Sequence, residues 1–579
     1  MRMSVMVAAC VLASSLAAAQ RGPAADVFGP TMVVDYNQRV PMRDGIELSA
    51  DVFRPRADGR YPVILLRTPY LKSGRNSTEQ GRAAVARGYV YIAMDVRGRG
   101  ESQGDFMPYQ HDGKDGYDAI EWAARQPWST GKVGTIGKSY DAGVEWLAAI
   151  QQPPHLVAMV SLATVGDPGT DIFNTGPTGV PTPTMISWYH LVAGHGIQDL
   201  SAVDWSALAW HLPLNTMDDV SGRPLPYWKE HLNHPGSDPW WDSQRYQTRY
   251  ADITVPVLHI TGWYDDVQGV TLKNFAGMTT AGHTNQKLIV GPWPHAINRS
   301  RKLGDIDFGP TAVIDLDGSI ARWFDYWLKG TPNGVMTEPA VKLFHMGDNA
   351  WADEAEWPIK RTQYTRYFLH SGGHANSLYG DGALSTTAPS SHESPDKFTY
   401  DPADPVPFIT EPTFAQLGGP DDYRPVERRD DVLVYTSEPV TDATLVCGPI
   451  RVQLQAASSG HDTDFTAKFL DVSPDGFAQR LSDGVVRGRY RDGMNRPSPL
   501  EPGKAYTYDI DLWNTCESFA AGHRFRVEIA SSAFPKYDRN LNTGEPVAGA
   551  TRMVVASQTI YHDAAHLSSI VLPIVPNAR

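Results

Sequence analysis

The sequence predicts an α/β protein in which a parallel-sheet domain carries an inserted helical cap and precedes an all-β sandwich. In residues 27–165 and again in 252–340, continuous apolar runs alternate with segments of helical period, a pattern typical of a buried parallel sheet. Residues 166–251 interrupt this rhythm, because they are rich in Trp, Pro, His and Gly and contain no strong strand pattern. From 341 to 579 the apolar period changes to two, which indicates half-buried antiparallel strands.

The first domain is expected to begin with a hairpin around Asp44-Gly45, a dipeptide that favours tight turns. Helices are expected where apolar residues recur with helical period, and Ser77 and Thr78 are candidate caps for the first of them. The expected strands are residues 33–40, 46–53, 61–70, 90–96, 133–137, 155–164, 255–265 and 286–293, and the expected helices are 79–87, 118–126, 140–150, 270–278 and 321–330.

The sandwich is predicted from three segments in which apolar and polar residues alternate. These segments are residues 450–456, 506–512 and 524–529. One face of each strand is therefore apolar, as in two sheets that pack face to face. Because a single core stops growing at about 250–300 residues, a chain of 579 residues is also expected to hold two or three domains.

Residues 1–19 are expected to form a signal peptide. Arg2 precedes an apolar stretch from Val5 to Leu16, and three alanines stand before Gln20 as a cleavage site would require. We therefore expect a secreted or periplasmic protein. In that oxidising compartment Cys447 and Cys516 could pair, and two free buried thiols are the alternative. The sequence lacks the C-x-x-C spacing that would indicate a thiolate metal site.

Composition restricts the partners. The net charge of -14 argues against nucleic acid and anionic membranes. After the leader, no run of about 18 apolar residues indicates a spanning helix. The oligomeric state is left open, and a homo-oligomer stays compatible with the sequence.

The most specific local motif lies between Gly134 and Gly143, around Ser139. It follows an apolar strand and precedes a helix, so Ser139 is expected at a tight strand-to-helix turn that exposes a nucleophilic hydroxyl. The alternative is a plain helix cap. A phosphate-binding loop is excluded, because that motif requires glycine where Lys132 stands.

A nucleophilic serine needs a base and an orienting carboxylate. Asp265 and His295 each follow an apolar strand, in the chain order that α/β-hydrolases use. The oxyanion needs donors as well. The backbone N–H of Tyr140 is one candidate, and the hydroxyl of Tyr70, on the loop after an early strand, is the other.

Several of these segments together resemble the family of bacterial cocaine esterase, α-amino-acid ester hydrolases, glutaryl-cephalosporin acylases and X-Pro dipeptidyl-peptidases. The resemblance covers nearly the whole mature chain. The matching segments are RTPY (67–70), DVRGRGESQGDF (95–106), GKSYDA (137–142), GWYD (262–265), GPWPH (291–295), RWFDYWLKG (322–330) and GHRFRVEIASSAFP (522–535).

This resemblance implies an α/β-hydrolase core, a helical cap and a C-terminal jelly roll. It also implies the roles already given to Ser139, Asp265 and His295, with Tyr70 and the Tyr140 amide as the oxyanion hole.

The sequence departs from the family at two places. Ala142 stands where the turn usually has glycine. Positions that are acidic in the amino-ester hydrolases, two and three residues after the triad Asp, are Val267 and Gln268 here. Asp266 and Val267 are nevertheless retained as candidate substrate-binding residues.

The cap is rich in aromatic residues, and Trp188 and Tyr189 are candidate walls of an apolar acyl pocket, together with Trp205 and Trp210. Packing within the cap is the alternative for each of them.

The expected activity is hydrolysis of a small-molecule ester, an amide or a short peptide through an acyl-enzyme, with no metal or organic cofactor. Release of X-Pro dipeptides, or hydrolysis of α-amino-acid esters or β-lactam side chains, is the alternative within the enzyme class. A non-catalytic carbohydrate-binding protein is the alternative outside it.

Overall fold

Ten strands form one mixed sheet, whose spatial order is β1-β2-β4-β3-β5-β6-β7-β8-β11-β12. Each neighbouring pair from β4 to β11 is parallel, and the edges are antiparallel. The strands are β1 (Met32–Pro41), β2 (Glu47–Pro55), β3 (Tyr61–Thr68), β4 (Val90–Asp95), β5 (Ser129–Lys138), β6 (Leu156–Leu162), β7 (Val257–Tyr264), β8 (Gln286–Pro294), β11 (Val341–His345) and β12 (Ala350–Glu354).

The computed structural model describes residues 31–576, except 168–181, 235–237, 391, 412 and 416–417. The expected signal peptide, residues 1–19, lies outside the described residues. Within the described part, no helix is long and apolar enough to cross a membrane.

Helices flank the parallel strands, and every residue of β4 and β7 is buried, as the continuous apolar runs require. The helices are α1 (Arg75–Ala86), α2 (Asp112–Ala124), α3 (Tyr140–Ala149), α8 (Gln268–Thr280) and α9 (Leu316–Lys329). The prediction for α1 was wrong at its start. Gly74 occupies the cap position in an extended conformation without a side-chain cap, and Ser77 is buried within the helix.

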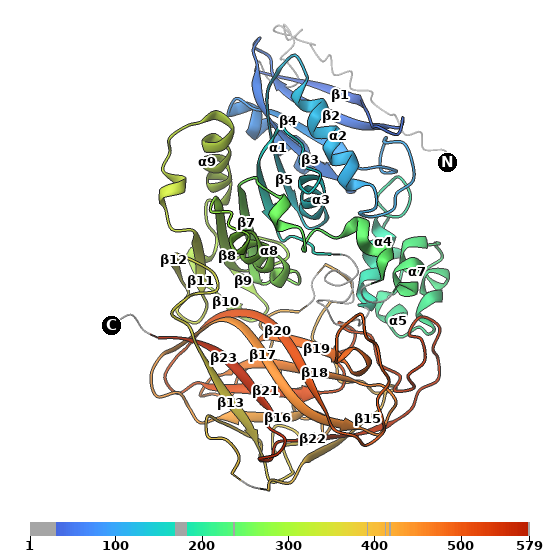
Figure 1. Cartoon of the computed structure of the whole chain (residues 1–579), viewed down its shortest axis with the longest axis vertical. Coiled ribbons are helices and arrows are strands. Elements are labelled where there is room, and N and C mark those ends of the chain that lie inside the picture. The colour runs from blue at the N-terminus through green and yellow to red at the C-terminus, as the bar shows by residue number, and fades with distance from the viewer. Residues whose placement is uncertain are drawn as a thin grey trace, which may run out of the picture.

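The cap consists of short helices without strands in its described residues. They are α4 (Ile186–Leu191), α5 (Trp205–Ala209), α6 (Met217–Val220) and α7 (Pro226–Asn233), joined by 3-10 turns. Figure 1 shows the parallel-sheet domain at one end of the molecule and the sandwich at the other, with the cap beside their junction.

Eleven strands form the all-β domain. They are β13 (Gln363–His370), β14 (Ala383–Ser385), β15 (Asp396–Tyr400), β16 (Leu433–Ser437), β17 (Thr444–Ser458), β18 (Asp464–Val472), β19 (Ala478–Arg487), β20 (Tyr506–Phe519), β21 (Arg524–Ala530), β22 (Ala556–Tyr561) and β23 (Ser569–Val575). The expected fold class is therefore confirmed. Cys447 and Cys516 are directly opposite one another on β17 and β20 and form a disulfide, which settles the alternative that the sequence left open.

The expected boundary between residues 340 and 341 is wrong. β11 pairs in parallel with β8, and β12 pairs with β11, so both strands belong to the first sheet. Val341, Leu343 and Phe344 are buried and Lys342 and His345 are half-buried, and such a local pattern cannot identify the partner strand. One core also runs across the junction, since Trp263 and Tyr264 pack in the same cluster as residues of the sandwich.

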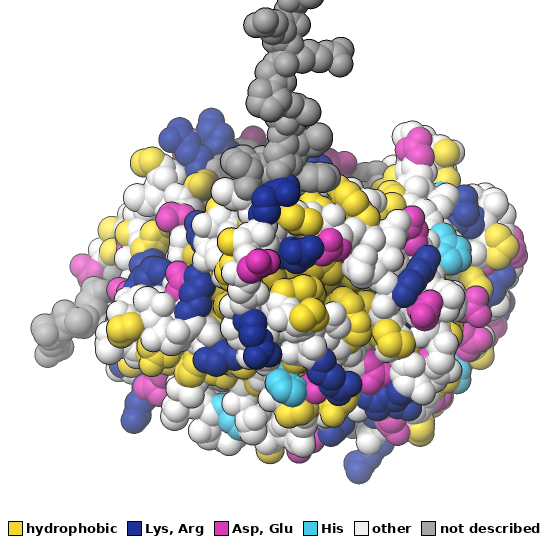
Figure 2. Space-filling view, turned by 90° about the horizontal axis from the view of Figure 1, so that it is seen from above, with side chains coloured by type: hydrophobic (Ala, Val, Ile, Leu, Met, Phe, Trp, Pro, Cys, Tyr) yellow, Lys and Arg dark blue, Asp and Glu magenta, His cyan; other side chains and the backbone are white. Residues whose placement is uncertain are grey.

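The surface of one end of the molecule mixes both signs of charge. Figure 2 looks onto the end that lies at the top of Figure 1, and basic, acidic and apolar side chains are interspersed there. The described residues of this face therefore form no continuous basic surface of the kind that nucleic acids require.

Candidate active site

Ser139 occupies the turn between β5 and α3 in a strained conformation. Its φ of 62° and ψ of -122° lie in a region that non-glycine residues rarely adopt. Its N–H donates to the Leu162 carbonyl over 3.0 Å, which fixes the turn against β6. A Cβ on Gly137 would lie 2.3 Å from the Asp141 carbonyl carbon. Glycine is therefore required two residues before Ser139.

The departure at Ala142 is accommodated by its neighbours. Ala142 is fully buried at the start of α3. The close approaches at this turn fall on Gly137 and Gly143, because a Cβ on Gly143 would lie 2.5 Å from the side chain of Val165. The methyl group of Ala142 therefore fits without disturbing the turn.

Tyr70 follows β3, and its hydroxyl is held beside Ser139. The indole of Trp188 donates to the Tyr70 oxygen over 2.9 Å, and the Ser139 side chain interacts with the same hydroxyl. Burial, and then the charge of Asp141, raise the pKa of Tyr70 far above its ordinary value. Tyr70 is thus a neutral O–H group that can act as a hydrogen-bond donor.

Tyr140 is anchored on the other side of Ser139. Its hydroxyl donates to Asp112 over 2.6 Å, and Asp112 pairs with Arg67 at the same distance. Its ring stacks on Trp188 with centroids 5.8 Å apart. Because Tyr140 is the first residue of α3, its N–H has no acceptor within the helix. Trp188 therefore contacts both residues predicted to form the oxyanion hole, through the hydroxyl of Tyr70 and the ring of Tyr140.

Arg99 links the loop that carries Tyr70 to the cap. The fully buried guanidinium donates to the carbonyls of Pro69 (2.8 Å), Val192 (2.6 Å) and Gly196 (3.2 Å), and it also binds Gly194. Burial lowers the pKa of Arg99 to about 10. Sequence reasoning missed this role, although Arg99 lies within the segment 95–106 that carries the family resemblance.

Asp265 and His295 follow β7 and β8 and contact one another. His295 Nδ1 lies 2.8 Å from Asp265 Oδ1, and the Thr261 hydroxyl donates to Asp265 Oδ2 over 2.7 Å. Burial opposes ionisation of Asp265, but the imidazole and these hydrogen bonds hold its pKa below the ordinary value. A carboxylate on Nδ1 leaves Nε2 available to accept a proton.

The turn at Ser139 and the loop of His295 touch through Lys138, whose ammonium lies 3.4 Å from the His295 carbonyl. Within the described residues no hydrogen bond joins the Ser139 hydroxyl to His295, and such contacts often tighten only when substrate binds. The structure thus brings together Ser139, Tyr70 and Tyr140, and separately joins Asp265 to His295.

Asp266 lies beside the same imidazole. Its Oδ1 is 3.4 Å from His295 Nδ1. Asp265, Asp266 and His295 are close enough to hold a metal ion. In this structure Asp265 and His295 form a hydrogen-bonded pair, and Asp266 is a second carboxylate beside the imidazole. Val267 is buried at the start of α8, and its N–H donates to Asp265 Oδ1 over 3.3 Å.

The aromatic residues of the cap divide into two groups. Trp188 reaches the candidate site, as described. Tyr189 instead points its hydroxyl toward His231 at 3.3 Å and packs on Tyr227. Trp205 packs on His190, and Trp210 packs on Phe534 with 46% of its surface exposed. For these three the contacts are those of packing within the cap or against the sandwich.

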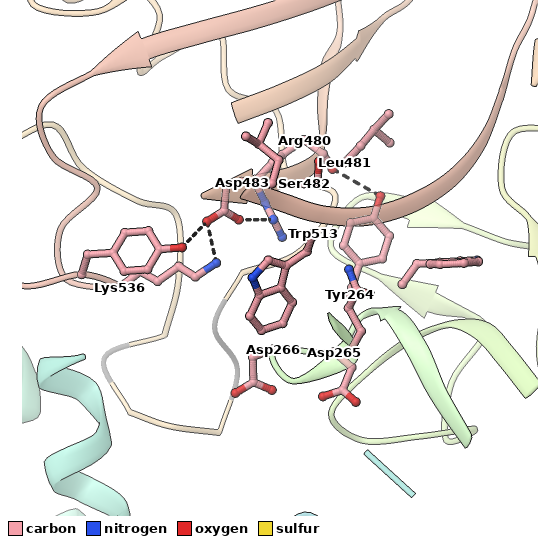
Figure 3. Close-up of a pocket in the computed structure, with 13 residues that line it drawn as sticks. Tyr264, Asp265, Asp266, Arg480, Leu481, Ser482, Asp483, Trp513 and Lys536 are labelled. Atoms are coloured by element: carbon pink, nitrogen blue, oxygen red, sulfur yellow. Dashed lines mark hydrogen bonds and ion pairs between the residues drawn. The ribbon is translucent and has the colours of Figure 1, made fainter. Parts of the chain in front are cut away.

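The sandwich supplies one wall of a pocket beside Asp265 and Asp266 (Figure 3). Asp483 on β19 accepts hydrogen bonds from Lys536 (2.6 Å), Arg480 (2.7 Å) and Tyr537 (2.9 Å). Trp513 lies between this cluster and the two aspartates. Sequence reasoning did not find this wall, although Lys536 directly follows the matching segment 522–535.

Comparisons with known proteins agree with this architecture. Residues 44–297 match the family model of X-Pro dipeptidyl-peptidase (S15 family), and residues 333–571 match the X-Pro dipeptidyl-peptidase C-terminal non-catalytic domain. Cocaine esterase from Rhodococcus sp. (strain MB1 Bresler) is 36% identical over 94% of this chain and 98% of its own length.

Two solved structures are similar over nearly the whole chain. An aminopeptidase from a marine sediment archaeon, Thaumarchaeota archaeon, has a TM-score of 0.84 at 27% identity and covers 97% of this chain and 99% of its own. An α-amino acid ester hydrolase has a TM-score of 0.82 at 26% identity and covers 97% of this chain and all of its own. The chain is therefore a hydrolase that belongs to the serine hydrolase family of cocaine esterase, α-amino acid ester hydrolase and the S15 X-Pro dipeptidyl-peptidases.

Proposed function

We propose that this protein is an exported serine hydrolase that cleaves small carboxylic esters or amides through an acyl-enzyme on Ser139. One observation carries the proposal. Ser139 is held at a positive φ between Tyr70 and Tyr140, on a turn that touches the loop of the Asp265–His295 pair. Family membership supports a serine hydrolase, and the assignment of the individual residues rests on this geometry.

In the proposed reaction His295 Nε2 accepts the proton of Ser139 as its oxygen attacks the substrate carbonyl. The Tyr70 hydroxyl and the Tyr140 N–H donate to the oxyanion of the tetrahedral intermediate. Protonated His295 then gives its proton to the leaving alcohol or amine. Water then attacks the acyl-enzyme, with His295 again as the base and afterwards as the acid that returns the proton to Ser139. Asp265 remains ionised throughout.

Among the substrates of this family, we favour simple esters and amides. An X-Pro dipeptidyl-peptidase must bind a free α-amine near the acyl site, and acidic side chains are the natural partners of an ammonium group. Val267 and Gln268 occupy positions where amino-ester hydrolases carry acids, and Asp266 is engaged with His295. Peptidase activity is the second candidate, because the family models that match the chain are those of X-Pro dipeptidyl-peptidases.

Export is part of the proposal. The Cys447–Cys516 disulfide supports an oxidising compartment, since disulfides persist there and are rare in the cytosol. Residues 1–19 have the composition of a leader that would direct the chain to it.

The test is labelling of purified protein by a fluorophosphonate, which reacts with activated serines. Wild type should be labelled and Ser139→Ala should not. Ser371→Ala is the matched control, because Ser371 Oγ lies 3.1 Å from His562 Nε2 and the other nitrogen of that imidazole lies 3.1 Å from Glu393. Absence of labelling in wild type would favour the non-catalytic alternative, and labelling lost only in Ser371→Ala would move the nucleophile to the sandwich.

A substrate panel separates the candidate activities. We expect faster turnover of p-nitrophenyl acyl esters than of Ala-Pro or Gly-Pro arylamides, aminoacyl methyl esters or β-lactams. Faster turnover of the Pro arylamides would establish the peptidase instead.

A further inference from the structure

The Nδ1 atom of His295 faces two carboxylates from adjacent residues. Asp265 Oδ1 lies at 2.8 Å and Asp266 Oδ1 at 3.4 Å. The Asp265 side chain is completely buried, whereas that of Asp266 is 15% exposed. In Figure 3 the two carboxylates lie next to one another and point away from the Lys536–Asp483 cluster. The reaction as described uses only the first of them.

The two carboxylates have different surroundings. Asp265 accepts from Thr261, from the Val267 N–H and from His295. Asp266 forms its ion pair with His295 and interacts with the Asp265 side chain. Asp266 is therefore less constrained than Asp265, and a small movement would bring it within hydrogen-bonding distance of Nδ1.

The charged groups around this pair come from four parts of the fold. Asp265 and His295 face Asp266 from the ends of β7 and β8, and Lys536 faces it from the sandwich. Lys138 faces His295 from the end of β5. Lys536 is already paired with Asp483, and among the described residues the ion pair of Asp266 is the one with His295.

We propose that Asp266 is a second positioning carboxylate for His295, which stabilises the imidazolium together with Asp265 and takes over Nδ1 when Asp265 is removed. The inference rests on the proposed function, because it concerns the base of that reaction. In each half-reaction a proton moves from Ser139 or water to Nε2, and the positive charge so created lies beside two carboxylates at Nδ1. No further reactant is required.

The pKa shifts of Asp266 and His295 agree with this arrangement. Burial raises the pKa of Asp266 to about 6, and the charge of Asp265 adds to this effect while His295 opposes it. Burial lowers the pKa of His295, but Asp266 and then Asp265 more than offset it, so that the pKa stands above its ordinary value. Removing the Asp266 charge should therefore let His295 become neutral at lower pH.

The first test is the pH dependence of kcat/KM for a p-nitrophenyl ester with Asp266→Asn. Opposite charges within about 4–6 Å shift a pKa by about 1–3 units, so we expect the acid limb to move down by about one unit. Asp58→Asn removes the same charge from an exposed loop residue and should leave the profile unchanged. Superimposable profiles of Asp266→Asn and wild type would overturn the proposal.

The second test removes the triad acid. Loss of that acid costs about 10⁴-fold in kcat in a serine protease. We expect the fall in kcat for Asp265→Ala to be at least about tenfold smaller than that, because Asp266 takes the place of Asp265. The double variant Asp265→Ala/Asp266→Asn should show the full fall in kcat of about 10⁴-fold. Thermal unfolding of each variant shows whether it is folded. If a folded Asp265→Ala variant is as inactive as the folded double variant, Asp266 does not replace Asp265.

Failure of this inference is distinct from failure of the proposed function. If Ser139→Ala retains wild-type turnover, the nucleophile is elsewhere and the proposed function fails. If Ser139→Ala is inactive while the Asp266 variants behave unlike these expectations, only the role of Asp266 is refuted.

Discussion

Replacing Tyr70 by Phe removes one hydroxyl from the centre of the candidate site. The Trp188 indole donates to the oxygen of Tyr70, so the hydroxyl proton of Tyr70 is not used in that contact. It is therefore free to be donated toward Ser139 and the oxyanion. The pKa of Tyr70 is raised by burial, so the group remains protonated at any pH at which the enzyme would be assayed.

The expected loss in kcat follows from this geometry. Loss of one oxyanion donor costs about 10²–10³-fold in kcat, or about 2.7–4 kcal/mol. Trp188→Phe removes the hydrogen bond that orients Tyr70 and keeps an aromatic ring beside Tyr140. A single hydrogen bond contributes about 1 kcal/mol, which corresponds to about fivefold. If Trp188 acts through Tyr70, the double variant should be no slower than Tyr70→Phe alone.

The assay is steady-state hydrolysis of a p-nitrophenyl ester by wild type, both single variants and the double variant. The effect should be on kcat with KM nearly unchanged, because the oxyanion exists only after attack. Fluorophosphonate labelling of each variant reports whether Ser139 is still in place. A Tyr70→Phe variant within about threefold of wild type in kcat would exclude Tyr70 from the oxyanion hole, since one donor supplies at least about 10²-fold.

Three further predictions concern the turn at Ser139 and the sandwich. Gly137→Ala should lower the free energy of unfolding by about 1–3 kcal/mol and abolish labelling of Ser139, measured by urea unfolding and fluorophosphonate; an unchanged midpoint with full labelling would refute the steric argument. Serine at both Cys447 and Cys516 should destabilise the sandwich by about 2–4 kcal/mol, seen as a lower urea midpoint that reductant no longer changes; a wild-type midpoint would show that the bridge contributes nothing. Burial lowers the pKa of His562, but Asp396 and Glu393 raise it overall above the ordinary value of 6.5. The contribution of protonated His562 to stability is therefore fully present below the ordinary value and is lost as the pH rises through the pKa of the folded protein. The difference in melting temperature between wild type and His562→Gln should therefore shrink as the pH is raised from about 6.5, and a difference that grows instead would contradict the sign.

The sequence allowed prediction of those parts of the site that depend on short stretches of chain. Ser139 was placed by a glycine two residues before it on a strand-to-helix turn, and that glycine is the one that sterics require. Asp265 and His295 were placed because each follows a buried strand. Strands β7 and β8 are neighbours in the sheet, and the carboxyl ends of parallel strands meet at one edge.

The parts that could not be predicted depend on pairings between distant segments. Arg99 contacts carbonyls of Val192 and Gly196, more than ninety residues later, and an arginine within a loop gives no local sign of such partners. Asp483 and Lys536 lie 53 residues apart and meet only because β19 and the segment after β21 face the same junction. The expected boundary at 341 was wrong for the same reason, since the residues of β11 do not specify that the strand pairs with β8.

The contacts of the candidate site also bear on how the three parts of the chain act together. Tyr70 and the turn at Ser139 belong to the sheet domain, Trp188 and the carbonyls bound by Arg99 belong to the cap, and the wall beside Asp266 belongs to the sandwich. The apolar cluster of the sandwich includes Trp263 and Tyr264, directly before Asp265. Exposing that cluster by removing the sandwich would therefore disturb the strand end that orients His295. The sandwich, which contributes no candidate nucleophile or base to the proposed reaction, is in this structure part of what holds the base in position.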